Sequence, residues 1–244
     1  MPNVPHPVPA KSSFSQPPLR VIVLHGFTRN GQDMRQKLAP LVAKLPQDTV
    51  VDFPDGPLQC TEEQVTRNYR LWRAPIPDGP HKCWWNASED GLIYDGLDQS
   101  VKTLRQLVSE PTDSDRTGTA ANHSQTSLGI IGFSQGAIFA AILAALSRAG
   151  QFPALRFAVF IAGAPPRAEC LQHYFSAPLS LPTLHIWGVR DPMARKHCPA
   201  LFDLCNPTSS HRVKWSGNHS IPRDEQTVNH VARFIQTAPR ADHG

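Results

Sequence analysis

Short apolar, β-branched runs alternate with stretches of helical spacing along most of this chain. The first run, residues 19–24, reads Leu-Arg-Val-Ile-Val-Leu and predicts a buried strand. From residue 33 to residue 45, a methionine and three leucines recur at the spacing of one helix face. The chain is therefore predicted to begin its fold with a strand, a turn and a helix.

The rest of the chain continues this alternation. Further strands are predicted at residues 49–53, 128–131, 157–162, 183–188 and 212–215, and further helices at 92–108, 135–149, 195–204 and 224–237. Such a pattern predicts an α/β fold with a mostly parallel, doubly wound sheet and helices on both faces. In folds of this kind, ligands bind at the carboxyl ends of the strands.

Residues 55–91 interrupt the pattern, because they mix prolines, polar residues and aromatics without a sustained period. A segment of this length exceeds an ordinary connection, and long irregular segments often serve as lids or binding loops. Trp84 and Trp85 are candidates for binding substrate, and Trp72 and Tyr69 could join them. Packing in the core is an equally good interpretation for any one of these rings.

The length of 244 residues fits one domain, and 40% hydrophobic residues suffice for a sizeable core. We expect a disordered, Pro-rich arm at residues 1–18 and a single domain at 19–237. Within that domain, residues 110–126 are polar and rich in small side chains, which predicts a flexible insertion. Residues 238–244 are expected to form a tail.

Charge and apolar runs limit the classes of partner. The net charge is +4, from 24 basic and 20 acidic side chains, and the basic residues are scattered. Nucleic acid is therefore not expected as a partner. The longest apolar run, residues 136–146, is far shorter than the roughly 20 residues that cross a bilayer, so no membrane span is expected.

The cysteines and histidines predict neither a disulfide framework nor a metal site. Five cysteines, without any Cys-x-x-Cys spacing, indicate small, buried, reduced thiols and a cytoplasmic location; they are Cys60, Cys83, Cys170, Cys198 and Cys205. No His-Glu-x-x-His motif occurs, and we expect neither a metal nor a cofactor. His185, His197 and His211 are expected to be structural or solvated.

The candidate nucleophile lies in the sequence Gly132-Phe133-Ser134-Gln135-Gly136, between a predicted strand and a predicted helix. Gly-x-Ser-x-Gly in this context predicts a nucleophile elbow, in which a tight turn exposes the serine hydroxyl. Gly132 and Gly136 are expected because a Cβ atom at either position would collide where the strand turns into the helix.

A serine hydroxyl needs a base to take its proton, and that base needs an acid to orient it. Asp191 and His219 follow two later strands in the order serine, acid, histidine that this elbow requires. Asp191 has a second interpretation as a cap of the following helix, and His219 as a surface loop histidine. We favour the catalytic interpretation for both.

Acyl transfer also needs hydrogen-bond donors for the oxyanion. The expected donors are the backbone N–H groups of Gln135, after the nucleophile, and of Phe27, in the first strand-to-helix loop. Gly26 would let that loop approach the substrate. His25 is expected to brace the loop, or to be a partly buried turn histidine without that role.

Several segments together resemble the FSH group, the family of serine hydrolases within the α/β-hydrolases. The segments are Leu24-His25-Gly26-Phe27, Asn30-Gly31, Asp55-Gly56-Pro57, Trp84-Trp85, Tyr94-Asp95-Gly96-Leu97, the elbow, and Gly217-Asn218-His219-Ser220-Ile221-Pro222. The resemblance spans residues 19–237 and implies an α/β-hydrolase fold. It also implies a Ser134, Asp191, His219 triad and oxyanion donors at Phe27 and Gln135. Relatives often carry a second glycine where this chain has Asn218.

The leading hypothesis is a serine esterase that cleaves carboxylic esters of acyl chains through an acyl-enzyme. One alternative is a thioesterase that releases an acyl or polyketide chain from a carrier protein. A second is a non-catalytic binding module on the same fold, although such a module would not need the serine, acid and histidine together. A peptidase or transacylase is also compatible with a triad, since a triad does not fix the substrate.

Overall fold

The computed structural model describes residues 18–110 and 126–238. Its centre is a six-stranded sheet in the order β10-β9-β8-β7-β1-β2, with every neighbouring pair parallel. The strands are β1 (Leu19–Leu24), β2 (Val50–Asp52), β7 (Ser127–Phe133), β8 (Leu155–Ile161), β9 (Thr183–Gly188) and β10 (Ser210–Trp215). The parallel sheet confirms the fold class predicted from the alternating pattern.

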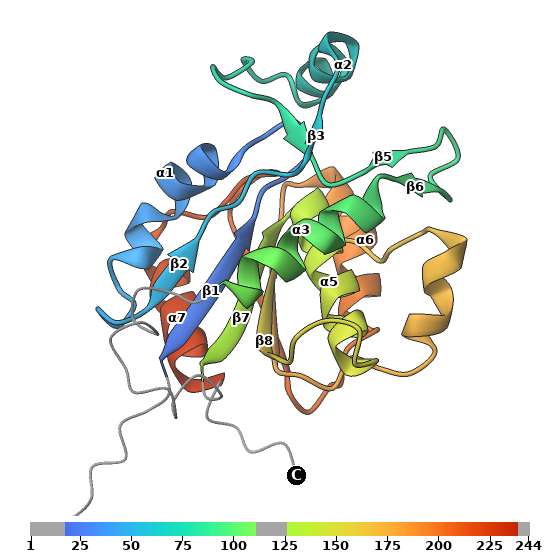
Figure 1. Ribbon diagram of the computed structural model, residues 1–244. Helices are drawn as coiled ribbons and strands as arrows, with labels where there is room; N and C mark the ends of the chain where they lie inside the picture. Colours follow the sequence, from blue (N-terminus) through green and yellow to red (C-terminus); the bar gives the residue numbers. More distant parts are fainter. Residues whose placement is uncertain (1–17, 111–125, 239–244) are drawn as a thin grey trace, which may run out of the picture.

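Helices cover both faces of this sheet (Figure 1). They are α1 (Gly31–Val42), α2 (Glu62–Trp72), α3 (Leu97–Ser109), α5 (Gln135–Arg148), α6 (Pro192–Phe202) and α7 (Glu225–Thr237), with a 3-10 helix η2 (Glu169–Phe175). Val21 and Val23 pack with α1 and α7, whereas Ile22 and Leu24 pack with α3 and α5. Alternate side chains of one strand thus supply the cores of the two faces.

The order of the strands creates a switch point between β1 and β7. From β1 the chain goes to β2 at one edge of the sheet, and then returns to β7 on the other side of β1. Connections that leave two neighbouring strands in opposite directions open a crevice at the strands' carboxyl ends. The loop after β1 and the elbow after β7 both lie there.

The prediction of an irregular segment at 55–91 is wrong for residues 62–72, which form α2. Thr61 and Gln64 form a capping box at the start of this helix. One short antiparallel pair flanks it, β3 (Leu58–Gln59) with β4 (Lys82–Cys83), and a second pair follows, β5 (Asn86–Ala87) with β6 (Tyr94–Asp95). Figure 1 shows α2 standing beyond the ends of the sheet strands.

Other elements differ from their predictions mainly at the ends. The helix predicted at 92–108 begins at Leu97, because Tyr94 and Asp95 pair with β5 and Gly96 adopts a left-handed conformation (φ 81°) before it. His211 lies within β10 instead of before it. The predicted arm, most of the predicted insertion and the tail lie outside the described residues. In the described part of the chain, no helix is long and apolar enough to cross a membrane.

Candidate active site

Ser134 occupies a strained position between β7 and α5. Its backbone φ is 53° and its ψ is −115°, which few non-glycine residues adopt. The conformation is held from both sides: Ser134 donates its N–H to the Ile161 carbonyl (2.9 Å), and its own carbonyl accepts from Ala137 (3.0 Å) and Ile138 (3.1 Å). The strand and the helix therefore fix the direction of the hydroxyl.

Both elbow glycines are required by close backbone contacts. A Cβ atom on Gly132 would lie 2.2 Å from the Gly136 carbonyl oxygen, and one on Gly136 would lie 2.3 Å from the Leu24 carbonyl oxygen. These distances are far inside van der Waals contact. The second contact also shows that α5 begins against the end of β1, which brings the elbow next to the loop after β1.

The histidine and the acid converge on Ser134 from two other strand ends. His219, after β10, places Nε2 3.0 Å from the Ser134 Oγ and Nδ1 2.7 Å from the Asp191 Oδ2. A carboxylate can only accept from Nδ1–H, so the neutral ring leaves Nε2 free to accept the serine proton. The sequence prediction of these three positions thus corresponds to one connected hydrogen-bond chain.

Asp191 satisfies both interpretations offered by the sequence. Its Oδ1 accepts from the N–H groups of Met193 (3.0 Å) and Ala194 (3.1 Å) and so caps α6, while Oδ2 faces His219. The side chain is fully buried. Burial opposes ionisation, but the hydrogen bond and charge of His219 and the two amides outweigh it and lower the pKa of Asp191. The acid is therefore held as a carboxylate.

The loop after β1 lies directly against the nucleophile. A Cβ atom on Gly26 would lie 3.3 Å from the Ser134 Cβ and 3.0 Å from the Phe133 ring. Phe27 and Ser134 line the same cavity. Gln135 is the first residue of α5, where a backbone N–H has no carbonyl partner within its own helix. Both expected oxyanion donors thus belong to segments that meet at Ser134.

Hydrogen bonds of the His25 ring hold this loop in place. Its Nε2 accepts from the Gly56 N–H (2.7 Å), so its Nδ1 carries the proton and donates to the Gly26 carbonyl (2.8 Å). Asp55, in the same turn as Gly56, accepts from the Gly31 N–H (2.6 Å). The Asp-Gly-Pro turn thereby ties both ends of the loop to the body of the fold.

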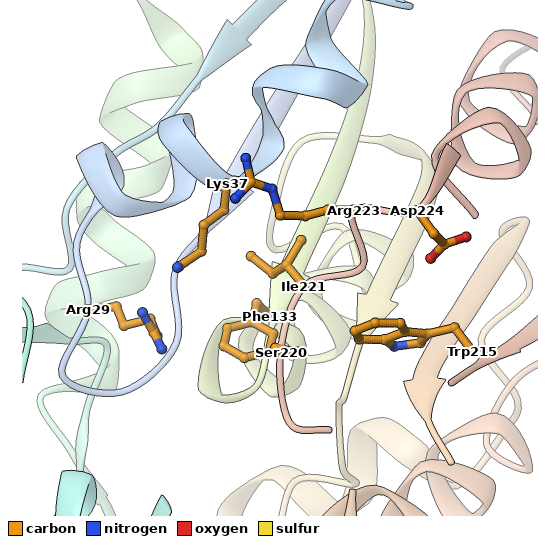
Figure 2. Close-up of a pocket in the computed structure, with 8 residues that line it drawn as sticks. All are labelled: Arg29, Lys37, Phe133, Trp215, Ser220, Ile221, Arg223 and Asp224. Atoms are coloured by element: carbon orange, nitrogen blue, oxygen red, sulfur yellow. The ribbon is translucent and has the colours of Figure 1, made fainter. Parts of the chain in front are cut away.

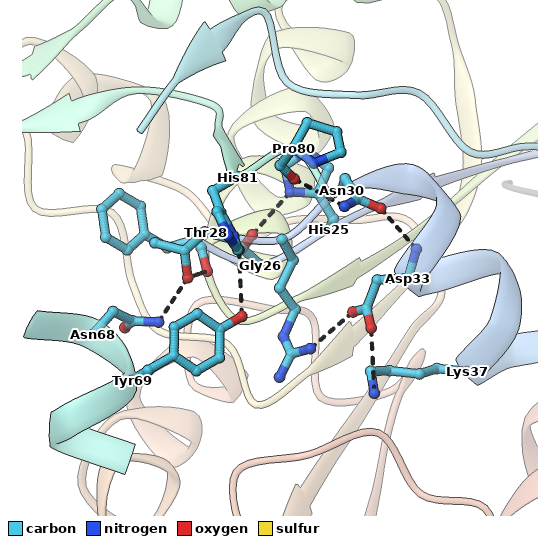
Figure 3. A network of polar contacts seen from close by, with 12 residues as sticks. His25, Gly26, Thr28, Asn30, Asp33, Lys37, Asn68, Tyr69, Pro80 and His81 are labelled. Carbon is cyan, nitrogen blue, oxygen red and sulfur yellow. Dashed lines mark hydrogen bonds and ion pairs between the residues drawn. The ribbon is translucent and has the colours of Figure 1, made fainter. Parts of the chain in front are cut away.

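A second set of polar contacts connects the loop to α2 (Figure 3). Thr28 has a φ of 61°, and its carbonyl accepts from Tyr69 (3.4 Å) and contacts the His81 ring nitrogen Nδ1 (3.0 Å). Its hydroxyl accepts from Asn68 (2.8 Å), and Asn30 donates to the Pro80 carbonyl (2.9 Å). Helix α2 is therefore anchored on the expected oxyanion loop.

Trp72, at the end of α2, lies at the site as the sequence allowed, but its contact with the histidine was not predicted. Its ring stacks on His219 with centroids 4.2 Å apart and planes inclined by 4°. It also lines a cavity of about 300 Å³ with Tyr69, Phe27 and Ser134. The signal was present, because the Thr61-x-x-Gln64 capping box precedes Val65, Tyr69 and Trp72 at helical spacing.

Trp84 and Trp85 belong to the core, so their predicted role in binding substrate is corrected. Their exposed fractions are 0% and 3%. Trp84 donates its indole N–H to the His25 carbonyl (2.8 Å) and stacks on the His25 ring. The Gln135 side chain accepts from the Trp84 N–H and donates to the Trp85 carbonyl. Trp84 and Trp85 therefore pack in the core next to the site and do not line its cavity.

The remaining candidates are structural. His185 is buried between the Phe160 and Phe202 rings. Four of the five cysteines are buried as expected, but Cys170, on η2, is exposed. Among the described residues, no group of three or more His, Cys, Asp or Glu side chains could hold a metal ion.

The two buried histidines predict a loss of stability in mild acid. Burial lowers the pKa of His25 from 6.5 to about 4 and that of His185 to about 3. Between these values and 6.5 the unfolded chain binds more protons, so the free energy of unfolding decreases as the pH falls. From pH 7 to pH 5 each ring should remove about 2 kcal/mol.

Urea unfolding at both pH values measures this loss, and His185→Leu provides the comparison. The variant should lose about 2 kcal/mol less than the wild type, because one of the two groups is gone. An equal loss in both proteins would contradict the assignment.

A family model described as "Serine hydrolase (FSH1)" matches residues 14–231, which include all three strand ends that meet at Ser134. The chain belongs to the FSH1 serine hydrolase family. This membership confirms the resemblance noted in the sequence and identifies an ester-cleaving serine hydrolase. The segments around His25, Gly56 and Ser134, on which that resemblance rested, pack together in the structure.

Relatives of this FSH1 chain include two with nearly equal identity. Esterase OVCA2 of Danio rerio is 28% identical over 231 residues, which cover 86% of this chain and 92% of the esterase. A dihydrofolate reductase of Schizosaccharomyces pombe is 27% identical over 237 residues, which cover 91% of this chain. The chain spans 48% of that reductase, about half its length, and the reductase activity is therefore not assigned to this chain.

Solved structures support the same fold. Acyl-protein thioesterase 2 of Zea mays has a TM-score of 0.63 at 20% identity, covering 93% of this chain and 96% of that one. A carboxylesterase from Mesorhizobium loti has a TM-score of 0.60 at 15% identity, covering 91% and 90%. At these identities the likeness concerns the α/β-hydrolase fold alone.

Proposed function

We propose that this FSH1 hydrolase cleaves carboxylic esters of acyl chains through a covalent acyl-enzyme on Ser134. His219 takes the serine proton as Oγ attacks the acyl carbonyl, and the N–H groups of Phe27 and Gln135 stabilise the oxyanion. His219 then protonates the leaving alcohol. Water, deprotonated by the same histidine, releases the acid and restores Ser134.

The connected chain from Asp191 through His219 to Ser134 carries this proposal, with contacts of 2.7 Å and 3.0 Å. The contacts lie within the range for a nucleophile and its base. A module that only binds ligands needs neither the strained serine nor the buried carboxylate. The strained backbone of Ser134 costs stability, which a binding module would have no reason to sustain.

A fluorophosphonate probe tests the nucleophile directly, because it phosphonylates serines that a base activates. The folded wild-type protein should react, and mass spectrometry should locate the adduct on the peptide that contains Ser134. A folded protein that stays unlabelled, or an adduct on another serine, would contradict the proposal.

Two finer parts of the hypothesis concern the partner and the location. An acyl-carrier protein as the source of a thioester substrate stays a prediction. A cytoplasmic location also stays a prediction. It is supported by five free cysteines, since an oxidising compartment favours disulfides.

Trp72 is proposed to position the catalytic base. The stacked ring covers one face of His219 and restricts its rotation, so Trp72→Ala should lower kcat/KM about tenfold, the upper range for an aromatic pair. Trp72→Phe retains a stacking ring and should stay close to wild type. The rate of fluorophosphonate labelling should follow the same order, since it reports the activation of Ser134 without ester binding.

Equal labelling rates for wild type and Trp72→Ala would contradict the positioning role. A change in KM alone, with kcat and the labelling rate preserved, would indicate that Trp72 only lines the acyl cavity.

A further inference from the structure

A second hollow of about 370 Å³ lies beside the cavity that contains Ser134. The two hollows share Arg29, Phe133 and Ser220 in their walls. A ligand whose carbonyl lies at Ser134 can therefore extend past these side chains into the second hollow. Nothing in the proposed acyl transfer uses this space.

Three cationic side chains reach the second hollow from separate segments (Figure 2). Arg29 follows β1, Lys37 lies on α1, and Arg223 precedes α7. Figure 2 shows the charged ends of Arg29 and Lys37 on the same side of the opening, with Arg223 reaching across beside Lys37. Their positive charge is therefore gathered at one place by the fold.

Two nearby carboxylates neutralise this positive charge only in part. Asp33 pairs with Arg29 (2.9 Å) and with Lys37 (3.4 Å). Asp224 caps α7 through its Oδ1, and Figure 2 shows its carboxylate turned away from the three cations. Within the described part of the chain, Arg223 forms neither an ion pair nor a hydrogen bond. A net positive charge is left to face a ligand.

Apolar side chains also line the second hollow, and Phe133 is shared with the cavity that contains Ser134; the others are Ile221 and Trp215. The side chains of Arg29 and Lys37 are only 22% and 35% exposed, so both charges are partly withdrawn from water. Partial desolvation strengthens their attraction for an opposite charge. The arrangement fits a ligand with a short apolar stretch that ends in an anion.

We propose that the second hollow binds an anionic group, a carboxylate or a phosphate, on the ester or thioester that Ser134 cleaves. This inference rests on the proposed function and adds the substrate class to it. An arginine offers paired N–H donors to either anion, and a lysine adds a point charge. The anion has two possible sources: the far end of the acyl chain, or the alcohol or thiol that leaves.

Matched substrate pairs distinguish the two sources. For the acyl side, mono-p-nitrophenyl esters of adipic, suberic and sebacic acid are compared with the same compounds carrying a methyl ester at the far end. For the leaving side, butyryl-coenzyme A is compared with the neutral thioester butyryl-N-acetylcysteamine. The acyl-side pairs differ only at the far end of the chain, so their ratio of kcat/KM measures the preference for charge. Coenzyme A also adds a nucleotide, so its preference is assigned to charge only where loss of the cations lowers it.

The variants are Lys37→Gln with Arg223→Gln, and Lys102→Gln as the control. Lys102 is exposed on α3, on the opposite face of the sheet from α1, and lines neither hollow. Wild type should prefer the anionic member of at least one pair. The double variant should lower that preference about tenfold, whereas the control should keep it. Salt at 0.5 M should reduce the preference in wild type.

Equal kcat/KM within both pairs for wild type, or a preference that the double variant keeps, would overturn the anionic subsite while leaving ester cleavage intact. Failure of the proposed function has a different result, in which no substrate is cleaved. In that event, calorimetric titration with the intact suberate monoester decides the subsite. Binding that requires the free acid and is lost in the double variant supports it, and absence of binding overturns it.

Discussion

Ser134→Ala should reduce kcat for p-nitrophenyl esters by about 10⁶-fold, the loss seen when the nucleophile of a triad is removed. The hydroxyl forms the acyl bond, and no other side chain lies in hydrogen-bond contact with His219 Nε2 in the described part of the chain. The residual rate would come from oxyanion stabilisation and binding alone. Steady-state kinetics with a mock-purified control measures it.

The fold should survive this substitution. Alanine and serine meet the same steric cost at a φ of 53°, and the backbone contacts of Ser134 to Ile161 and Ala137 do not involve the side chain. The free energy of unfolding in urea should change by about 1 kcal/mol or less. An Ala variant that keeps a tenth of the wild-type kcat would show that Ser134 is not the nucleophile.

The proposed triad could be predicted from the sequence because each member lies at or just after the end of a strand. The turns after parallel strands can be recognised from local sequence patterns. The sheet then brings these turns together at one edge. Ser134, Asp191 and His219 lie far apart in sequence, but the strands β7, β9 and β10 end on the same edge of one sheet. The predicted strands and the turns after them were therefore sufficient to predict these three residues of the site.

The aromatic residues could not be placed in the same way. Trp72 and Trp84 occur in the same polar segment; Trp72 ends a short stretch of helical spacing, whereas Trp84 lies in no periodic run. Their positions depend on tertiary contacts: Trp84 fills the space behind His25, whereas Trp72 reaches His219 because α2 is fixed to the loop at Thr28. A capping box indicated α2, but no local pattern indicates which ring faces the core.

The second hollow likewise could not be predicted. Its cations, Arg29, Lys37 and Arg223, are scattered along the chain, and scattered charge predicted only that nucleic acid is not a partner. They meet because α1 and the segment before α7 lie on the same face of the sheet, where α1 and α7 share one apolar core. Charge patterns along a sequence reveal runs of like charge, but they do not reveal charged side chains that only the fold brings together.

Asp191→Asn should reduce kcat by about 10⁴-fold while the fold stays intact. The asparagine oxygen can still accept from Met193 and Ala194 and cap α6, so the amide nitrogen would face His219. An amide donates to Nδ1, which forces the ring proton onto Nε2. That tautomer cannot take the proton from Ser134, and catalysis fails although every heavy atom stays near its place.

Asp191→Ala separates the two roles of this carboxylate. It removes the cap of α6 as well as the partner of His219, and should therefore cost about 1 kcal/mol of unfolding free energy beyond the asparagine variant. Activity that falls only in proportion to stability, with the Asp191→Asn variant nearly as active as wild type, would contradict the catalytic role. Asp191 would then serve as a helix cap, and another acid would orient His219. A fully active, less stable alanine variant would give the same answer. Loss of activity in the stable asparagine variant must come from the changed partner of His219, through the wrong tautomer and the missing negative charge, because the cap remains.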